Sequence, residues 1–354
     1  MAITFDHTTL GQRVLFGTGK ARDHAVSALE GLGAQRVLLI ADQFAMELSD
    51  AIAAQAPVVE RIHDIVQHVP VEKGRAAVEL AESAGIDAVV TIGGGSATGL
   101  AKVVARDTGL PIVAIPTTFA GSEATNVWGQ TEGERKTTGV DDRVLPRVIV
   151  YDAALSLSLP GHLATASGLN AVAHAVDGFW APRADPINAA LGTEGLRALV
   201  PGLRALHADA DDLLARERTL YGAYLAAVAF ASAGSGMHHK ICHVLGGAYA
   251  LSHAEMHAIV LAYVTAFNAP AAPAAASRVS SALGGADAAA GLYELRAELG
   301  IVGSLAELGL QERSIPEAAR LAAEAIPASN PRPFDVSDVE GIIRAAWAGE
   351  PVTG

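Results

Sequence analysis

Short runs of β-branched and apolar residues alternate with helix-like segments through the first 152 residues of this 354-residue chain. Such alternation is typical of a mostly parallel sheet, because each parallel strand needs a crossover segment before the next. The amphipathic pattern of Glu72–Ala84 predicts one crossover helix. The predicted strands, in chain order, are Arg13–Phe16, Arg36–Ala41, Val58–Ile65, Ala88–Ile92, Ile112–Ile115 and Arg147–Tyr151.

The chain after the Leu159-Pro160-Gly161 breaker has a different character, since it is rich in Ala and Leu with helical periodicity. A chain of this length also exceeds what one hydrophobic core usually supports. We therefore expect an α/β plus all-α protein with two domains. Residues 1–157 form a Rossmann-like dinucleotide-binding domain, and residues 158–354 form a helical substrate domain. The two prolines of Ala269–Ala276 predict a connection between helices.

The net charge of −13 leaves no basic excess with which to neutralise a phosphate backbone, so we expect no nucleic-acid partner. A single cysteine, Cys242, excludes an internal disulfide and fits a reducing compartment. The sequence carries no signal-peptide pattern and no apolar stretch of membrane-spanning length. We expect a cytoplasmic enzyme that does not associate with membranes.

A glycine-rich turn follows the predicted strand Ala88–Ile92 and precedes a helical pattern that starts at Ala97. Free backbone amides and the positive end of a helix dipole favour a bound phosphate group at such a turn. The sequence therefore predicts a pyrophosphate site, with a simple tight turn as the alternative. The residues concerned are Gly93, Gly94, Gly95 and Ser96.

Asp42 ends the second predicted strand, about twenty residues after the Gly17-Thr18-Gly19 turn. An acidic side chain there can bind the ribose hydroxyls of a dinucleotide, although it can equally cap a helix. Its carboxylate would repel a 2′-phosphate, which favours NADH and leaves NADPH open. Further cofactor contacts are predicted from Thr117, Thr118 and Ser122, in the loop after the fifth strand. Lys136 is also a predicted contact, with a solvated loop lysine as the alternative.

Five of the twelve histidines fall between positions 238 and 257. Three pairs of polar residues are spaced four apart, so each pair shares a face if its segment is helical. Leu245-Gly246-Gly247 predicts a break that folds two of these pairs toward each other. The pairs are His239 with His243, His253 with His257, and Asn170 with His174.

Imidazoles at this spacing normally indicate a divalent metal site that is completed by a carboxylate. Asn170 stands where that carboxylate is expected, and an amide is a poorer ligand. The alternative is a metal-free site, in which imidazoles and Lys240 donate hydrogen bonds to substrate carboxylates and to a developing oxyanion. Taken singly, His238 and His257 are also explained as buried core residues.

In three segments the chain resembles the iron-containing alcohol dehydrogenase superfamily, and within it the branch that reduces maleylacetate: Gly93–Ser96, Pro116–Glu123 and His238–Gly247. The resemblance runs over essentially the whole length. It implies a dehydroquinate synthase-like fold and a homodimer. It also implies reduction of the C=C bond of maleylacetate, or of its chlorinated forms, by NADH or NADPH, giving 3-oxoadipate in the breakdown of aromatic compounds.

In metal-dependent members of this superfamily, an Asp and a His four apart and two later histidines hold the ion. The corresponding positions here are Asn170, His174, His239 and His253, and the resemblance implies that no metal is required. We assign His243 or His253 to the enolate oxygen, with a neighbouring imidazole as the proton donor, and Lys240 and His239 to the substrate carboxylates. His174, Asn170 and His238 are further expected substrate contacts.

Three other functions remain open from the sequence. The first is a metal-dependent alcohol or polyol dehydrogenase that tolerates Asn170 as a ligand. The second is a lyase of the dehydroquinate synthase kind, which uses NAD only transiently. The third is a nucleotide-binding module without catalysis, which gives no reason for the histidine cluster.

Overall fold

The structure is a computed structural model that describes residues 4–67, 69–133, 135–249 and 251–352. The chain divides into two compact units. One comprises Leu10–Pro160, and the other comprises the helical segment from Gly161 onward together with residues 4–9. The sequence analysis places the division at residue 157 and assigns residues 4–9 to the first domain.

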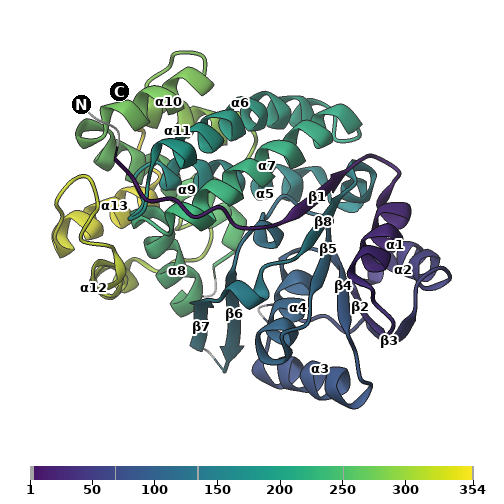
Figure 1. Ribbon diagram of the computed structural model, residues 1–354. Helices are drawn as coiled ribbons and strands as arrows, with labels where there is room; N and C mark the ends of the chain where they lie inside the picture. Colours follow the sequence, from purple (N-terminus) through teal and green to yellow (C-terminus); the bar gives the residue numbers. More distant parts are fainter. Residues whose placement is uncertain (1–3, 68, 134, 250, 353–354) are drawn as a thin grey trace. The chain divides into compact units, whose positions relative to one another are not determined.

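A six-stranded sheet organises the first unit, with the strand order β1-β8-β5-β4-β2-β3 and every neighbouring pair parallel (Figure 1). Each predicted strand is present, with ends that differ by a few residues, and the predicted crossover helix is α3. The strands are β1 (Arg13–Phe16), β2 (Val37–Ala41), β3 (Val58–Ile62), β4 (Ala88–Gly93), β5 (Ile112–Pro116) and β8 (Val148–Tyr151).

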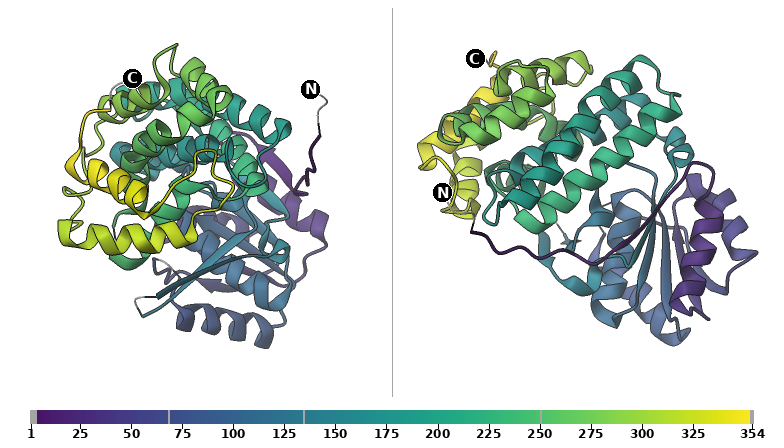
Figure 2. Two further views of the ribbon diagram at one scale, coloured as in Figure 1. Left: turned by 90° about the vertical axis from the view of Figure 1, so that its left-hand side faces the viewer. Right: turned by 45° about the horizontal axis from the view of Figure 1, so that its top comes forward.

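Helices cover both faces of this sheet, which Figure 2 shows edge-on in its right-hand view. Alternate residues of β2 explain why: Val37 and Leu39 join one apolar cluster, and Leu38 joins the other. The helices α1 (Ala21–Leu32) and α2 (Met46–Ala53) contribute to the first cluster. The helices α3 (Val71–Ser83) and α4 (Gly95–Thr108) contribute to the second.

An antiparallel hairpin, β6 (Val127–Glu132) with β7 (Arg135–Val140), also belongs to the first unit. The sequence analysis missed it and treated Lys136 as a loop residue. The hairpin is polar and its described residues are only partly buried, so it lacks the apolar alternation that predicts a strand. The backbone of Lys136 lies in β7, whereas its side chain, and with it the predicted cofactor contact, falls outside the described part.

The second unit is helical throughout its regular structure. Pro273 begins α10 at a position where a helix tolerates proline, so the prediction of a plain connection through Ala269–Ala276 is wrong in its second half. The helices are α5 (Gly161–Gly178), α6 (Pro186–Ala208), α7 (Leu213–Ala233), α8 (Met237–Tyr249), α9 (His253–Asn268), α10 (Pro273–Ala282), α11 (Ala288–Glu298), α12 (Ile315–Ala325) and α13 (Val336–Ala348).

In the described residues, six short 3-10 turns complete the regular elements. They are η1 (Gln43–Ala45), η2 (Ser122–Ala124), η3 (Asp142–Val144), η4 (Ala153–Ser158), η5 (Ala269–Ala271) and η6 (Glu312–Ser314). Three of them (η1, η3 and η4) follow strands of the first unit directly, and each is capped by an aspartate. Among the described helices, none alone has the length and apolarity to span a bilayer; α7 and α8 pass only as a pair bent by 97°.

Asp152, at the end of β8, binds the turn that contains Gly17 and Gly19. Its carboxylate accepts hydrogen bonds from the amides of Gly19 at 2.9 Å, Ala21 at 3.0 Å and Ala154 at 3.0 Å. The amide of Gly19 is therefore engaged within the protein. This turn serves to join β1 and α1 to the end of β8.

We expect Asp152→Ala to destabilise the protein by about 2 kcal/mol, because it leaves amides in a half-buried turn without an acceptor. Chemical denaturation followed by circular dichroism measures the change. Glu79→Ala is the matched control: its carboxylate is exposed, with Arg75 at 3.9 Å, and exposed pairs contribute little. Equal stability of the two variants would contradict the assigned role of Asp152.

Candidate active site

The glycine turn at the carboxyl end of β4 is shaped by two neighbouring side chains. Gly93 has φ of 152°, and a Cβ atom there would lie 2.8 Å from Asp42 Oδ2. A Cβ on Gly94 would lie 3.0 Å from Thr118 Cγ2, whereas one on Gly95 would meet nothing within 4 Å. The glycines thus let Asp42 and Thr118 close on the turn and leave Gly95 open for a ligand.

The helix α4 begins at Gly95, with Gly94 as its N-cap and no side chain capping it. Ser96 lies in its first turn and is partly exposed. Backbone amides at this position have no acceptor inside the helix. The turn therefore has the arrangement expected for a phosphate site.

Asp42 performs the capping role that the sequence analysis gave as the alternative. Its Oδ1 accepts a hydrogen bond from the amide of Phe44 at 3.0 Å, at the start of η1. Burial raises the pKa of the Asp42 carboxyl above its ordinary value. The second oxygen, Oδ2, lies beside Gly93, so capping and a ribose contact can use different oxygens.

The segment after β5 brings Thr117 and Thr118 against the same turn. The amide of Thr117 donates to the carbonyl of Gly93 at 3.2 Å. Thr118 lies against Gly94, and Ser122 opens η2 with its carbonyl accepting from the ammonium of Lys102 at 2.7 Å. Of this group, sequence reasoning missed Lys102, although its position in the helix after the glycines was visible.

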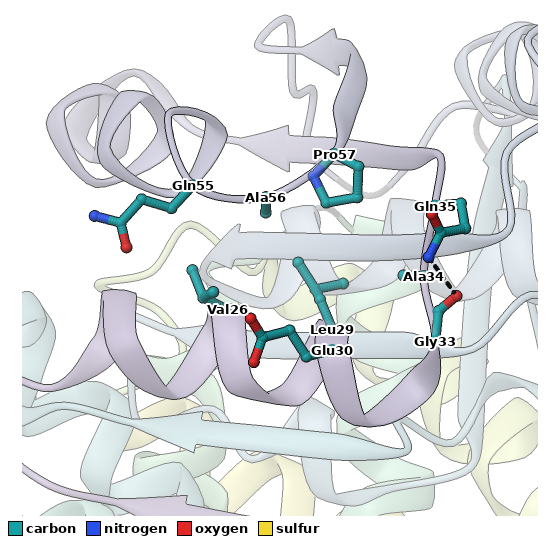
Figure 3. Close-up of a pocket in the computed structure, with 9 residues that line it drawn as sticks. All are labelled: Val26, Leu29, Glu30, Gly33, Ala34, Gln35, Gln55, Ala56 and Pro57. Atoms are coloured by element: carbon teal, nitrogen blue, oxygen red, sulfur yellow. Dashed lines mark hydrogen bonds between the residues drawn. The ribbon is translucent and has the colours of Figure 1, made fainter.

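A separate pocket lies at the opposite edge of the sheet (Figure 3). Its lining includes Gln35 and Pro57, which directly precede β2 and β3. Ligands of parallel α/β sheets bind outside the carboxyl ends of the strands, whereas this pocket lies at their amino ends. We therefore assign the candidate cofactor site to the glycine turn.

In the helical unit, three helices bring the predicted histidines together. His174 on α5 lies 5.1 Å from His239 on α8, and His239 lies 4.9 Å from His257 on α9, measured between ring centroids. His243 lies 6.1 Å from His239, and His253 lies 4.3 Å from His257. Both pairs spaced four apart are helical, as the spacing predicts.

The predicted break at Leu245-Gly246-Gly247 is wrong. Helix α8 continues through both glycines to Tyr249, and α9 starts at His253. A Cβ on Gly246 would lie 3.2 Å from the methyl group of Met256. The first glycine thus permits close packing of α8 on α9 and does not end the helix.

In the histidine cluster, sequence reasoning missed Asp177. It is fully buried on α5, and its carboxylate accepts from the Nδ1–H of His239 at 2.8 Å and from the amide of Gly236 at 2.8 Å. The indole of Trp180 donates to it at 3.2 Å. The spacing in the sequence could have identified Asp177, because it is seven residues after Asn170 and so lies on the same face of a helix.

This contact determines which nitrogen of His239 carries the proton. With Nδ1–H directed at a carboxylate, Nε2 carries the lone pair, and it is buried with no hydrogen-bond partner among the described residues. Burial lowers the pKa of His239 well below its ordinary value and that of His174 to about 4. His239 is therefore neutral near pH 7 and accepts through Nε2, which disfavours the carboxylate contact predicted for it.

His238 and His257 bind each other. Their Nε2 and Nδ1 atoms lie 3.0 Å apart, both rings are fully buried, and Cys242 Sγ lies 3.8 Å from the same His238 nitrogen. By contrast, His243 and His253 are exposed and Lys240 is partly exposed. The arrangement separates a buried layer of imidazoles from an accessible layer that contains the predicted enolate donors.

Two matches cover most of the chain. Residues 11–153 match the iron-containing alcohol dehydrogenase family, and residues 164–347 match the C-terminal domain of the Fe-containing alcohol dehydrogenase family. The chain belongs to the iron-containing alcohol dehydrogenase family.

Its similar relatives include the maleylacetate reductase of Sphingobium indicum, 42% identical over 98% of both chains, and maleylacetate reductase 1 of Rhodococcus opacus, 41% identical over 95% of this chain and 94% of the relative. An iron-containing alcohol dehydrogenase from Corynebacterium glutamicum is 47% identical, with a TM-score of 0.94 over 99% of this chain and 98% of that one. The maleylacetate reductase of Rhizobium sp. strain MTP-10005 is 38% identical, with a TM-score of 0.93 over 99% of both.

The residues at the metal positions of this family do not fit a metal ion well. Asn170 supplies an amide in place of a carboxylate, so the set carries no negative charge. Among the described residues, the group whose ligand atoms lie within 4.8 Å of one another is His238, His239 and His257, which is a different set. Two of those three already share a hydrogen bond. We derive no chemical step through a metal.

We expect Asp177→Asn to destabilise the protein by roughly 3 kcal/mol, because a buried acceptor of several N–H groups loses its charge. The loss should appear in denaturant unfolding. The Nδ1 proton of His239 should also become less firmly held, and nitrogen-15 NMR of the imidazoles reports this. Asp209→Asn, on an exposed loop, is the control; unchanged imidazole signals in Asp177→Asn would refute the tautomer assignment.

Proposed function

We propose that this chain is a maleylacetate reductase, an enzyme that uses NADH or NADPH to reduce the C=C bond of maleylacetate to 3-oxoadipate. The observation that carries the proposal is the histidine cluster with Asn170 in place of a metal-binding carboxylate. The similarity to several maleylacetate reductases over nearly the full length of the chain supports it.

The cofactor, when bound, supplies the hydride. We assign its diphosphate to Gly93–Ser96 and the α4 N-terminus, and its adenosine ribose to Asp42. Thr117, Thr118 and Ser122 are the further proposed contacts. The carboxylate of Asp42 disfavours a 2′-phosphate, which supports NADH as the preferred cofactor.

The side chains of this protein would stabilise the negative charge of the enolate and supply the proton. Hydride addition β to the ketone leaves an enolate, and its oxygen needs hydrogen-bond donors. His243 or His253 can supply one, and loss of such a donor typically costs about 10² to 10³ in rate. A neighbouring imidazole then protonates the α-carbon, which completes the addition of two hydrogens across the C=C bond.

Lys240 is the cation that we assign to a substrate carboxylate. It projects from the same helix as His239 and His243 and lowers the pKa of His239 further. The lone pair on His239 Nε2 would instead accept a hydrogen bond, for example from an enol. Asn170 and His174 remain proposed substrate contacts, whereas the full burial of His238 and its bond to His257 disfavour the contact predicted for His238.

A required metal is not part of this proposal, because the family positions lack a carboxylate. The family name favours one competing function, a metal-dependent alcohol or polyol dehydrogenase. A homodimer, a cytoplasmic location, a role in aromatic catabolism and action on chlorinated maleylacetates belong to the proposal as extensions of the resemblance.

The decisive assay follows loss of NADH absorbance with purified protein and enzymatically generated maleylacetate, with and without a chelator. We expect turnover that the chelator does not change and formation of 3-oxoadipate. Activity on simple alcohols that is lost with chelator would support the competing dehydrogenase. Absence of net NADH consumption would leave a lyase or a module without catalysis.

We expect Lys240→Ala to raise KM for maleylacetate at least about tenfold with a much smaller change in KM for NADH, because a charged contact to the substrate is lost. Steady-state kinetics with each substrate varied in turn measures the split. Lys73→Ala removes an exposed lysine that pairs with Asp64 and should behave like the wild type. Equal effects on both KM values would argue against carboxylate binding by Lys240.

A further inference from the structure

A buried ammonium group lies under the segment that follows β5. Lys102, in the middle of α4, is only 1% exposed. Burial lowers its pKa to about 7, against the opposing charge of Glu123. A cation is costly in such a place unless its hydrogens are satisfied. The hydrogen-bond partners of Lys102 therefore indicate its role in the structure.

The Nζ atom of Lys102 donates to backbone carbonyls of one short stretch. These are Ser122 at 2.7 Å, Thr125 at 2.8 Å and Val127 at 2.7 Å, with the Thr125 hydroxyl also at 3.0 Å. An ammonium has three hydrogens, so it can satisfy one carbonyl with each. An apolar side chain in its place would leave these carbonyls without that donor.

The stretch that Lys102 holds, residues 122–127, overlaps the end of the segment Pro116–Glu123, which contains the predicted cofactor residues, and continues beyond it. The beginning of the whole loop, residues 116–127, is attached to the glycine turn by the Thr117 amide. Its middle is held by Glu123, which accepts from the Tyr151 hydroxyl at 2.7 Å through its side chain and from Gln12 at 2.9 Å through its carbonyl. Lys102 is the contact that reaches this loop from the helix whose N-terminus faces the phosphate position.

We propose that Lys102 is a positioning residue for the diphosphate of the cofactor: it holds residues 116–127 so that Thr118 stays against Gly94 at the α4 N-terminus. The inference rests on the proposed function, since it assumes a dinucleotide at this turn. The ligand class concerned is a nucleoside diphosphate. Lys102 acts through the loop and does not touch the ligand.

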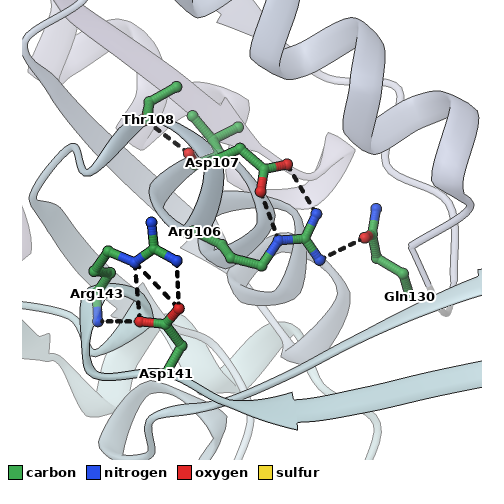
Figure 4. Close-up of polar contacts among 7 residues, drawn as sticks. Arg106, Asp107, Thr108, Gln130, Asp141 and Arg143 are labelled. Atoms are coloured by element: carbon green, nitrogen blue, oxygen red, sulfur yellow. Dashed lines mark hydrogen bonds and ion pairs between the residues drawn. The ribbon is translucent and has the colours of Figure 1, made fainter.

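Helix α4 also offers a matched control one turn later. Arg106 binds Asp107 and the Gln130 side chain (Figure 4). Its guanidinium carbon also lies 4.4 Å from the centroid of the Trp128 ring. Arg106 joins α4 to the hairpin, and in the described part of the chain its side-chain hydrogen bonds go to Asp107 and Gln130, with none to residues 116–125. Replacing Arg106 removes a cation from the same helix and leaves residues 116–127 held.

The test compares Lys102→Met and Arg106→Met with the wild type by calorimetric titration of NADH, ADP and adenosine. We expect Lys102→Met to bind NADH and ADP at least about tenfold more weakly, with adenosine within about twofold of the wild type. Arg106→Met should match the wild type for all three. Unchanged NADH and ADP affinity, or an equal loss for adenosine, would overturn the proposal.

Thr125→Val is the second variant, in case Lys102→Met does not fold. It removes one acceptor of Lys102 and the hydroxyl that donates to the Ser122 carbonyl, and it keeps the ammonium. We expect a loss of ADP affinity of about threefold with adenosine unchanged; no loss contradicts the proposal. If the wild type binds NADH but does not reduce maleylacetate, the proposed function is wrong and this inference stands. If Lys102→Met reduces maleylacetate and binds NADH as tightly as the wild type, this inference is wrong and the proposed function stands.

Discussion

The buried carboxylate of Asp177 is the contact on which the histidine site depends. It accepts from the first amides of α8 and from the Nδ1–H of His239, so a single group on α5 both places the start of α8 and selects the protonated nitrogen of its histidine. A carboxylate behind an imidazole normally serves a metal ligand. Here the same contact leaves His239 neutral, with its Nε2 without a hydrogen-bond partner among the described residues, inside a layer of other neutral imidazoles.

Each unit contains a buried charged group that is satisfied mainly by backbone groups and holds a segment near predicted functional residues. Asp177 collects N–H groups at the start of α8, and Lys102 collects carbonyls at the end of the loop after β5. In both cases, hydrogen bonds to the charged group offset the cost of its desolvation. The same hydrogen bonds fix a segment that carries predicted functional residues. In the proposed function, both charges act by holding backbone, and neither needs to contact a ligand.

The central strands β2, β4, β5 and β8 were predictable because they are buried on both faces and so appear as apolar runs. The hairpin β6–β7 was not, because Gln130, Thr131 and Thr137 carry no such pattern. Gly246 and Gly247 misled for a related reason: a glycine within a helix and one at its end look alike in sequence, and only the methyl group of Met256 shows which is present.

The sequence by itself determined the βα order of the first unit, the glycine turn at Gly93–Ser96, and the gathering of histidines at positions four apart, because these follow from local periodicity and spacing. The tertiary structure alone decided which nitrogen of His239 is free, that His238 and His257 bind each other, and that Lys102 reaches Val127. Those contacts join residues 25, 19 or 62 positions apart along the chain. Only the packing of helices and strands that are distant in the sequence brings such residues within hydrogen-bond distance, and no local pattern encodes it.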